Sequence, residues 1–409
     1  MSRPTILILS QVYVPDPASV GQHVADAAEE MARRGYGVVV YTSARGYDDP
    51  SRRYPSRETR NGVEVRRLPL SSFGKSSILV RLIAQGLFFV QAIARGLLTH
   101  GLCGVMVSTS PPFCGAAGVV VSRLRGVPLK YWVMDLNPDQ MVAMGKLRPH
   151  SLPVRVFDAL NRAVLRQADD VVVLDRFMAE RVAGKVKFQI ELDVMPPWPH
   201  EDRPENIAHE ENPYRREHVP PGSFVLMYSG NHSAANPIGT ILDAVERLQD
   251  DPRLLLFCIG GGEGKREVEG RIRRGVRNIR SFPYQPLDSI RFSLSAADAH
   301  VVSIGDGLVG IVHPCKVYGA MAVSRPVLFV GPALSHVGEL IDRLKIGWQV
   351  AHGDVENAVS TIREMMETPA DERTAMGRRA REATAGDLGR NSLLRRFCDV
   401  LERGLPPPT

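Results

Sequence analysis

The stretch 303–330 carries residue types that could bind a phosphate or a diphosphate. Three glycines between residues 305 and 310 follow a predicted apolar strand at 300–302, and Lys316 follows Pro314 at a predicted helix start. The backbone N–H groups and the positive dipole end of such a helix start attract anions, and the Lys316 ammonium would add a full charge. The alternative is a surface turn shaped by glycine and proline, with Lys316 solvated.

Two other loops of the second half could contact the same kind of ligand. Gly230, Asn231 and His232 follow the predicted strand FVLMYS and could present hydrogen-bond donors to a diphosphate, although an Asx or Ser/Thr turn explains them equally. Gly262 ends a run of three glycines after the strand LLLFCI. That run is a weak signal, because the chain has neither GxGxxG with a ribose acid in register nor GxxxxGK[ST].

The first half offers two candidate positions at loop boundaries. Asp135 ends the predicted strand LKYWVMD, where its carboxylate could orient a hydroxyl of a bound substrate or could cap the following turn. Gly21 lies where a loop meets the predicted helix from about 20 to 34. It could allow close backbone approach to a ligand, or it could belong to a plain N-terminal turn.

The segment 78–98 is long and apolar, and its polar positions fall on one arc about 120° wide at helical spacing. Arg81 and Arg95 lie within it, which argues against a transmembrane helix. Six arginines between residues 52 and 67 precede it. We therefore expect an interfacial helix that touches the inner membrane or a lipid-linked substrate, with Phe88 and Phe89 on its apolar face. A helix buried in the first domain is the alternative.

The totals limit the class of protein. At 409 residues the chain is expected to form two domains, and its net charge of +6 suits phosphate ligands or an anionic membrane without indicating nucleic acid. The five cysteines lack a CxxC pair, which indicates reduced thiols in a cytoplasm. No Asp/His cluster has metal-ligand spacing, so no metal is expected. The apolar run at the N-terminus is too short for a signal peptide.

Strand and helix signals alternate through both halves, which is typical of an α/β protein with parallel sheets. The proline-rich, charged segment 201–221 interrupts the alternation and is predicted to be an interdomain linker. The predicted domains are 1–200 and 222–386, and a last helix is predicted in 387–409.

The second half contains, in this order, the segments YSGNHSAANPIGTILDAVERL, CIGGGEGKREVE, NIRSFPYQPLDSIRFSLSAADAHVV and HPCKVYGAMAVSRPVL, and the first half contains the 18–21 and LNPDQ loops. These segments and their order resemble a retaining GT-B glycosyltransferase of family 4, and more narrowly the colanic-acid and O-antigen sugar transferases. The resemblance implies two Rossmann-like domains facing each other across a cleft, with the donor in the second domain, the acceptor in the first, and the last helix in 387–409 crossing back to the first domain. It also implies transfer without a metal ion or another cofactor.

The chain departs from that family's pattern at several positions. Ile311 and Gly319 stand where most relatives carry two glutamates, and Asp306 is the nearest substitute for the first. The usual GR…KG phosphate pair is absent, and Lys316 is the obvious replacement cation. Met134, next to Asp135, replaces the common strand-end histidine.

The resemblance implies transfer of a sugar from a nucleotide sugar, UDP-linked more than GDP-linked, to a lipid-linked or saccharide acceptor in cell-surface polysaccharide synthesis. The protein would be cytoplasmic and peripherally associated with the inner membrane. The rivals are a nucleotide-sugar epimerase and a membrane-associated binding protein with a degenerate donor site. The roles we expect are Lys316 with the backbone amides of Gly21, Gly307, Leu308 and Val309 for the diphosphate and sugar, Asp135 and Asp306 for hydroxyls, and Pro283 and Tyr284 for the base.

Overall fold

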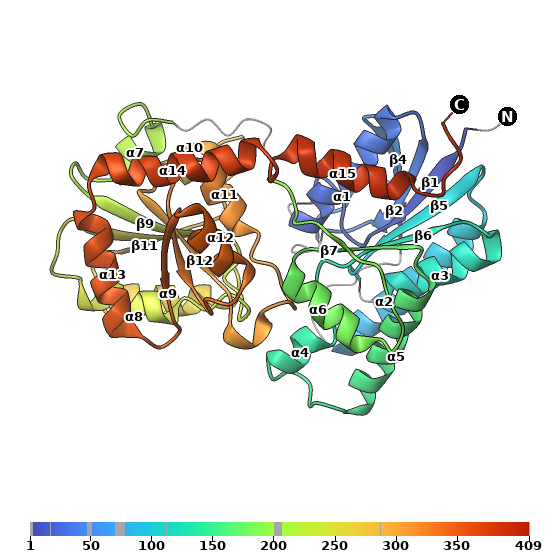
Figure 1. Ribbon diagram of the computed structural model, residues 1–409, viewed down its shortest axis with the longest axis horizontal. Helices are drawn as coiled ribbons and strands as arrows, with labels where there is room; N and C mark the ends of the chain where they lie inside the picture. The colour runs from blue at the N-terminus through green and yellow to red at the C-terminus, as the bar shows by residue number, and fades with distance from the viewer. Residues whose placement is uncertain are drawn as a thin grey trace. The chain divides into compact units, whose positions relative to one another are not determined.

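The computed structural model describes residues 3–16, 18–46, 51–69, 78–111, 113–199, 207–286 and 288–408, with side chains in the helix that begins at Ile78 described from residue 83 onward. The chain divides into two compact units (Figure 1). Unit 1 comprises Met1–Pro197 and Asn391–Thr409, and unit 2 comprises Trp198–Arg390. Each unit is built on its own mainly parallel sheet covered by helices.

The sheet of unit 1 has the strand order β3-β4-β2-β1-β5-β6-β7-β8. All pairings are parallel except that of the edge strand β3 with β4. The central strands are short apolar runs buried on both faces, as parallel strands between helix layers must be. The strands are β1 (Thr5–Leu9), β2 (Gly37–Ser43), β3 (Arg57–Arg60), β4 (Val63–Leu68), β5 (Leu102–Ser108), β6 (Leu129–Trp132), β7 (Asp170–Val173) and β8 (Asp193–Val194).

Helices cover both faces of this sheet (Figure 1). On one face α2 packs against α3 at Gly96, where an added Cβ would lie 2.9 Å from a Val121 methyl. On the other face Trp132 contacts α15 through Phe397, with ring centroids 4.3 Å apart. The helices of this unit are α1 (Ser19–Arg33), α2 (Ile78–Leu97), α3 (Cys114–Arg125), α4 (Asp139–Ala143), α5 (Leu152–Gln167), α6 (Arg176–Lys185) and α15 (Arg390–Glu402).

The sheet of unit 2 is wholly parallel, with the strand order β11-β10-β9-β12-β13-β14. The chain steps outward from β9 to β11 and then returns to the other side of β9. This makes the gap between β9 and β12 the point where the strand order reverses, which is where open α/β sheets bind ligands. The strands are β9 (Phe224–Ser229), β10 (Leu254–Ile259), β11 (Ile279–Phe282), β12 (Ala299–Ser303), β13 (Val327–Val330) and β14 (Gly347–Val350).

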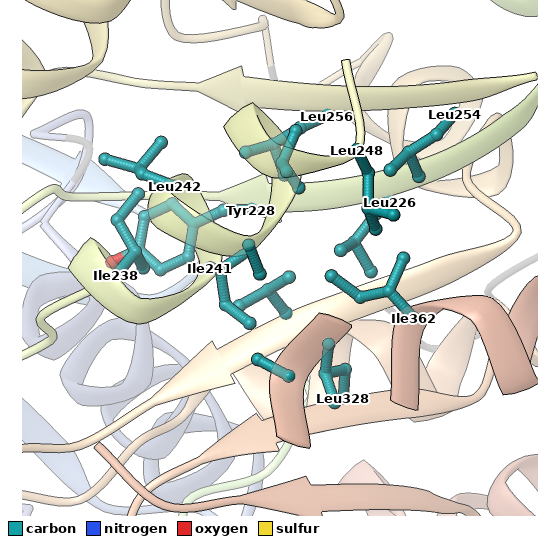
Figure 2. Packing of buried hydrophobic residues seen from close by; sticks show 14 of the residues in the cluster. Leu226, Tyr228, Ile238, Ile241, Leu242, Leu248, Leu254, Leu256, Leu328 and Ile362 are labelled. Atoms are coloured by element: carbon teal, nitrogen blue, oxygen red, sulfur yellow. The ribbon is translucent and has the colours of Figure 1, made fainter. Parts of the chain in front are cut away.

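The main core of unit 2 lies between this sheet and helices α8 and α13 (Figure 2). Leu226 and Leu256 on neighbouring strands pack with Ile241 and Ile362 from the two helices, and all four are fully buried. The helices of this unit are α7 (Pro213–His218), α8 (Gly239–Arg247), α9 (Lys265–Arg273), α10 (Ile290–Ser295), the 3₁₀ turn η1 (Asp306–Leu308), α11 (Lys316–Ala322), α12 (His336–Leu344), α13 (Val355–Glu367) and α14 (Ala370–Ala385).

The segment expected to be a linker contains helix α7, which packs on unit 2. Arg215 forms an ion pair with Asp298 at 2.9 Å, and Asn212 donates to the carbonyl of Phe292. Residues 200–206 lie outside the described part of the chain. The described part of the predicted linker, from residue 207, therefore belongs to the folded surface of unit 2.

Helix α2 corrects the expectation for Phe88. Ala84, Phe88, Ala92 and Gly96 recur every four residues and are all buried, and Phe88 is only 1% exposed within the core of unit 1. Phe88 therefore cannot reach lipid, because the small residues of this stripe let the helix pack closely inward. Phe89 is partly buried, Arg95 is exposed, and the side chain of Arg81 lies outside the described residues. In the described part of the chain, no helix is long and apolar enough to cross a membrane.

Candidate active site

The loops that follow β9 and β12 are joined at the point where the strand order of unit 2 reverses. The Asn236 side-chain amide donates to the carbonyl of Ser303 at 2.7 Å, and the Gly305 N–H donates to the carbonyl of Ala235 at 3.1 Å. These bonds fix two of the three predicted ligand loops against each other at the carboxyl ends of neighbouring strands.

Lys316, the first residue of α11, lies over this junction. Its Nζ donates to Asn236 Oδ1 at 3.3 Å and lies 5.3 Å from the centre of the Tyr228 ring. Its Cε is 2.6 Å from the position of a Cβ added to Gly230, whose φ of +132° also favours glycine. Burial lowers the pKa of Lys316 to about 8. Among the described residues no carboxylate pairs with Lys316, so its positive charge is not neutralised by an ion pair there.

His232 supplies a second polar group beside Lys316. The side chain is 2% exposed and meets the Tyr228 ring edge-on, with centroids 4.6 Å apart. Burial and the neighbouring charge of Lys265 lower its pKa to about 4, so the ring is neutral at pH 7. The carbonyls of Gly230 and Gly261 face the ring, but neither ring nitrogen makes a hydrogen bond of normal geometry within the described part of the chain. A neutral imidazole of this kind can accept one hydrogen bond and donate another.

The glycines of the run after β10 lie too close to neighbouring residues for a larger side chain to fit. A Cβ on Gly260 would lie 2.1 Å from the carbonyl oxygen of Gly230, and one on Gly262 would lie 2.3 Å from Asn231 Oδ1. The Tyr284 ring packs on the same backbone, 3.2 Å from the Cβ position of Gly260, and remains 55% exposed. The structure therefore brings together Tyr284 and the glycines of two loops.

The loop after β12 is less open than the sequence indicates. The N–H of Leu308 donates to the carbonyl of Gly305 at 2.9 Å inside η1, and the Leu308 side chain is buried. Because this amide is already bonded, the expected role of Leu308 as a diphosphate donor is not supported by the geometry. Asp306 and Gly307 are exposed, Val309 is partly buried, and Asp306 makes no hydrogen bond or ion pair among the described residues.

The candidates of the first half lie in unit 1. The backbone N–H of Asp135 donates to Thr109 Oγ1 at 3.1 Å, and burial raises the pKa of its carboxyl to about 6. A Cβ on Gly21 would lie 3.1 Å from the backbone nitrogen of Tyr13. The Gly21 amide already donates to the carbonyl of Ala18, so close packing explains this glycine better than ligand binding does.

Comparisons with known proteins decide the class of the chain. Residues 19–198 match the family described as a glycosyl transferase 4-like domain. A protein of Escherichia coli named as a colanic acid biosynthesis glycosyl transferase, WcaI, is 25% identical, and the match covers 96% of this chain and 98% of that protein. A protein of Pseudomonas aeruginosa named as a glycosyltransferase, WbjE, is also 25% identical, over 88% of this chain and 89% of that protein. The chain is a glycosyltransferase.

Solved structures show the fold of this glycosyltransferase. WaaG, a glycosyltransferase involved in lipopolysaccharide biosynthesis, matches with a TM-score of 0.72 at 18% identity over 97% of this chain and 99% of that chain. Anabaena Alr3699/HepE in complex with UDP-glucose matches with a TM-score of 0.72 at 14% identity over 98% of this chain and 100% of that chain. The predicted α/β fold of the GT-B type is confirmed.

Two residues that the sequence analysis did not assign shape the site of the glycosyltransferase. Asn236 binds both Lys316 and the β12 loop. Lys265 is buried and donates to the carbonyls of Cys258 and Phe282 at 2.6 and 2.7 Å, so it ties the ends of β10 and β11 to the start of α9. Its position one residue after the glycine-rich run was the available sequence signal.

The two positions that lack the family's glutamates differ in their surroundings. Ile311 is 3% exposed, whereas a Cβ on Gly319 would meet only a Leu294 methyl at 3.9 Å. Neither position supplies a carboxylate, and the charged neighbours of His232 are Lys265 and Lys316. Within the described residues, no group of three or more His, Cys, Asp and Glu side chains is placed to hold a metal ion.

Proposed function

We propose that this glycosyltransferase moves a sugar, with retention of anomeric configuration, from a nucleotide sugar to a lipid-linked or saccharide acceptor in cell-surface polysaccharide synthesis. UDP is the expected nucleotide, with GDP second. The names of the relatives and the UDP-glucose complex of Anabaena Alr3699/HepE support this proposal. The observation that carries it is Lys316, a partly buried cation without a carboxylate partner in the described structure, beside neutral His232 and the glycines of the β9 and β10 loops.

The proposed mechanism is electrostatic and positional. In a retaining transfer the diphosphate leaves while the acceptor hydroxyl attacks from the same face, so negative charge grows on the leaving oxygen. Lys316 would stabilise that charge in a site whose low polarity strengthens the interaction. His232 would add a neutral hydrogen bond, Asp306 and Asp135 would orient hydroxyls of sugar or acceptor, and Tyr284 with Pro283 would contact the base.

We also propose that the protein works in the cytoplasm on the inner membrane surface, where a lipid-linked acceptor would be reached. Arg95 and the exposed apolar side chain Val90 of α2 support this part of the proposal, as does the exposed Leu98 directly after the helix. Phe88 no longer contributes to it, because that side chain lies in the core.

Calorimetry with UDP and GDP in excess chelator tests the donor half of the proposal. We expect binding without added divalent metal and a large loss of affinity in Lys316→Ala. Lys345→Ala is the matched control, because Lys345 is an exposed lysine of the same unit that pairs with Asp342. Binding that appears only after magnesium or manganese is added would contradict the metal-independent mechanism.

Turnover assays test the reaction itself. A panel of nucleotide sugars is incubated with and without a polyprenyl-diphosphate acceptor, and products are separated by mass. We expect consumption of one donor that depends on the acceptor. Conversion of the donor to an isomer without acceptor would instead support the epimerase, and tight binding without turnover of any donor would support a binding protein.

A further inference from the structure

Helices α2, α3 and α5 form one layer over a single face of the unit 1 sheet (Figure 1). Close contacts join the layer, because a Cβ on Gly96 would meet Val121 of α3 at 2.9 Å and one on Gly115 would meet Val164 of α5 at 3.0 Å. We call the solvent-exposed residues of these three helices the arginine face.

The charged residues of this layer are almost all basic. The three helices contain seven arginines, no lysine and a single acidic residue, Asp158, which pairs with Lys185. Helix α1, which covers the opposite face of the sheet, contains three acidic residues and one arginine. The whole chain is nearly balanced at 51 basic against 45 acidic residues, so the imbalance is specific to this layer.

The exposed arginines of the face are not neutralised within the protein. Arg95, Arg123, Arg155, Arg162 and Arg166 are exposed, and none forms an ion pair with a residue that the structure describes. Arg123 donates to the neutral side chain of Gln167, and Arg166 lies over the Phe188 ring. Intramolecular ion pairing therefore does not explain why arginine accumulates here.

Apolar side chains project between these arginines. Nine large hydrophobic residues in the described structure are exposed, and five of them lie on the arginine face, while a sixth, Leu98, directly follows α2. Leu98 and Leu152 are each 75% exposed, Leu124 is 68% exposed and Val90 is 62% exposed. Exposed leucines among uncompensated cations are typical of surfaces that rest in the headgroup region of a membrane.

We propose that the arginine face docks on a bilayer with anionic headgroups. This inference rests on the proposed function, because a lipid-linked acceptor requires the enzyme to reach a membrane surface. It assigns docking to three helices rather than to α2 alone. Arginines on such a face are attracted to anionic lipid, and the leucines remove apolar area from water at interfacial depth. A second copy of the chain fits this face poorly, because two such faces would bring like charges together.

Vesicle sedimentation tests the docking. Wild-type protein is mixed with neutral phosphatidylcholine vesicles or with vesicles containing about 30 mol% phosphatidylglycerol, at about 0.1 M and about 0.5 M salt. We expect binding to the anionic vesicles that weakens at high salt. The variant Arg155→Gln/Arg162→Gln/Arg166→Gln should lower the partition coefficient about 100-fold, since each arginine near the surface contributes about fivefold.

Two further variants keep the test specific. The matched control Arg273→Gln/Arg274→Gln/Arg378→Gln removes three exposed arginines from unit 2 and should change partitioning by less than about twofold. Leu124→Ser/Leu152→Ser should weaken binding with an unchanged melting temperature, because both side chains are mostly exposed.

Three results would overturn the proposal. They are equal binding to neutral vesicles, equal loss in the control triple variant, and a change of molar mass by light scattering in the Arg155/Arg162/Arg166 variant, which would assign the face to self-association. Nucleotide calorimetry on the same proteins separates this inference from the proposed function. Protein that binds anionic vesicles but no nucleotide refutes the donor proposal alone, and protein that binds nucleotide but no vesicle refutes the docking alone.

Discussion

The surroundings of the Lys316 side chain stabilise its positive charge poorly. Its ammonium has one hydrogen bond at 3.3 Å, and burial lowers its pKa from 10.5 to about 8. A group whose pKa is lower in the folded than in the unfolded state costs stability while it is protonated. A residue that costs stability at the carboxyl ends of the strands is best explained by a ligand that supplies the missing negative charge.

We expect Lys316→Met to stabilise the protein and to disable it. At pH 7 the gain should be about 1 kcal/mol or more, because a desolvated cation is replaced by an apolar chain of similar length. The gain should shrink as pH rises from about 8 and vanish above 10.5, since wild-type Lys316 then loses its proton in both states. Transfer should fall about 10²-fold or more. Thermal unfolding at several pH values and steady-state kinetics measure both effects, and wild-type turnover in this variant would remove Lys316 from the mechanism.

Asp135 predicts an acidic limb in the pH profile of transfer. Its pKa is raised to about 6 by burial, so below that pH the carboxyl is protonated and no longer present as the carboxylate that would orient a hydroxyl. Transfer should therefore decrease as pH falls through about 6. Asp135→Asn should be slower at pH 8 and should lack this limb, whereas Asp288→Asn, at an exposed position of unit 2, should keep it. An unchanged profile in Asp135→Asn would exclude the role.

Helix α2 shows how an element can be placed only by its neighbours. Apolar residues cover most of its circumference, so helical periodicity leaves several orientations open. The contacts at Gly96 with Val121 and Leu7 select one of them. The result puts Phe88 in the core and leaves Val90 at 62% exposure, two positions away.

Phe88→Ala should destabilise unit 1 by about 3–5 kcal/mol, because it leaves a cavity in a packed core. Val90→Ser on the exposed side of the same helix should change stability by less than about 0.5 kcal/mol. Urea unfolding followed by circular dichroism measures both. Equal and small effects of the two substitutions would mean that the helix is not held in the orientation described.

At the scale of the whole molecule, each unit has a core of its own, and the chain returns to unit 1 for its last helix. Phe397 of α15 is 1% exposed and packs on Trp132, while Arg34 binds Asp399 and Glu402 on the same helix. The stability of unit 1 therefore depends on residues that follow unit 2 in the sequence.

Phe397→Ala should weaken unit 1 selectively, by about 3–5 kcal/mol. Hydrogen exchange read by mass spectrometry should show faster exchange in β1, β5 and β6, with little change in β9 and β10. Leu256→Ala, in the core of unit 2, is the matched substitution and should give the opposite pattern. Faster exchange in unit 2 caused by Phe397→Ala would show that the two cores are not independent.

The sequence alone determined the class of fold, and it led to Lys316 as the candidate cation of the site. Short apolar strands alternating with helices specify parallel sheets, because strands buried on both faces must be apolar throughout. The glycines after β9 and β10 were visible in the sequence, but the structure supplied their reason: Gly230 and Gly260 each combine a positive φ with a close neighbour, which favours glycine. Lys316 was identifiable because it follows a glycine-rich strand end.

Only the tertiary structure decided what surrounds those residues. The partners of Lys316 are Asn236 and Tyr228, which lie 80 and 88 positions earlier in the chain and approach it because β9 and β12 are neighbours in the sheet. The tertiary structure also decided the surroundings of two other predicted residues. The backbone amide of Leu308 donates to Gly305 within a turn, and the Phe88 side chain points into the core because α2 packs against α3 and β1. The residue type and its sequence neighbours indicate which interactions a side chain is able to make. Its burial and its actual partners depend on contacts between segments that are distant in the sequence, and a local sequence pattern does not specify those contacts.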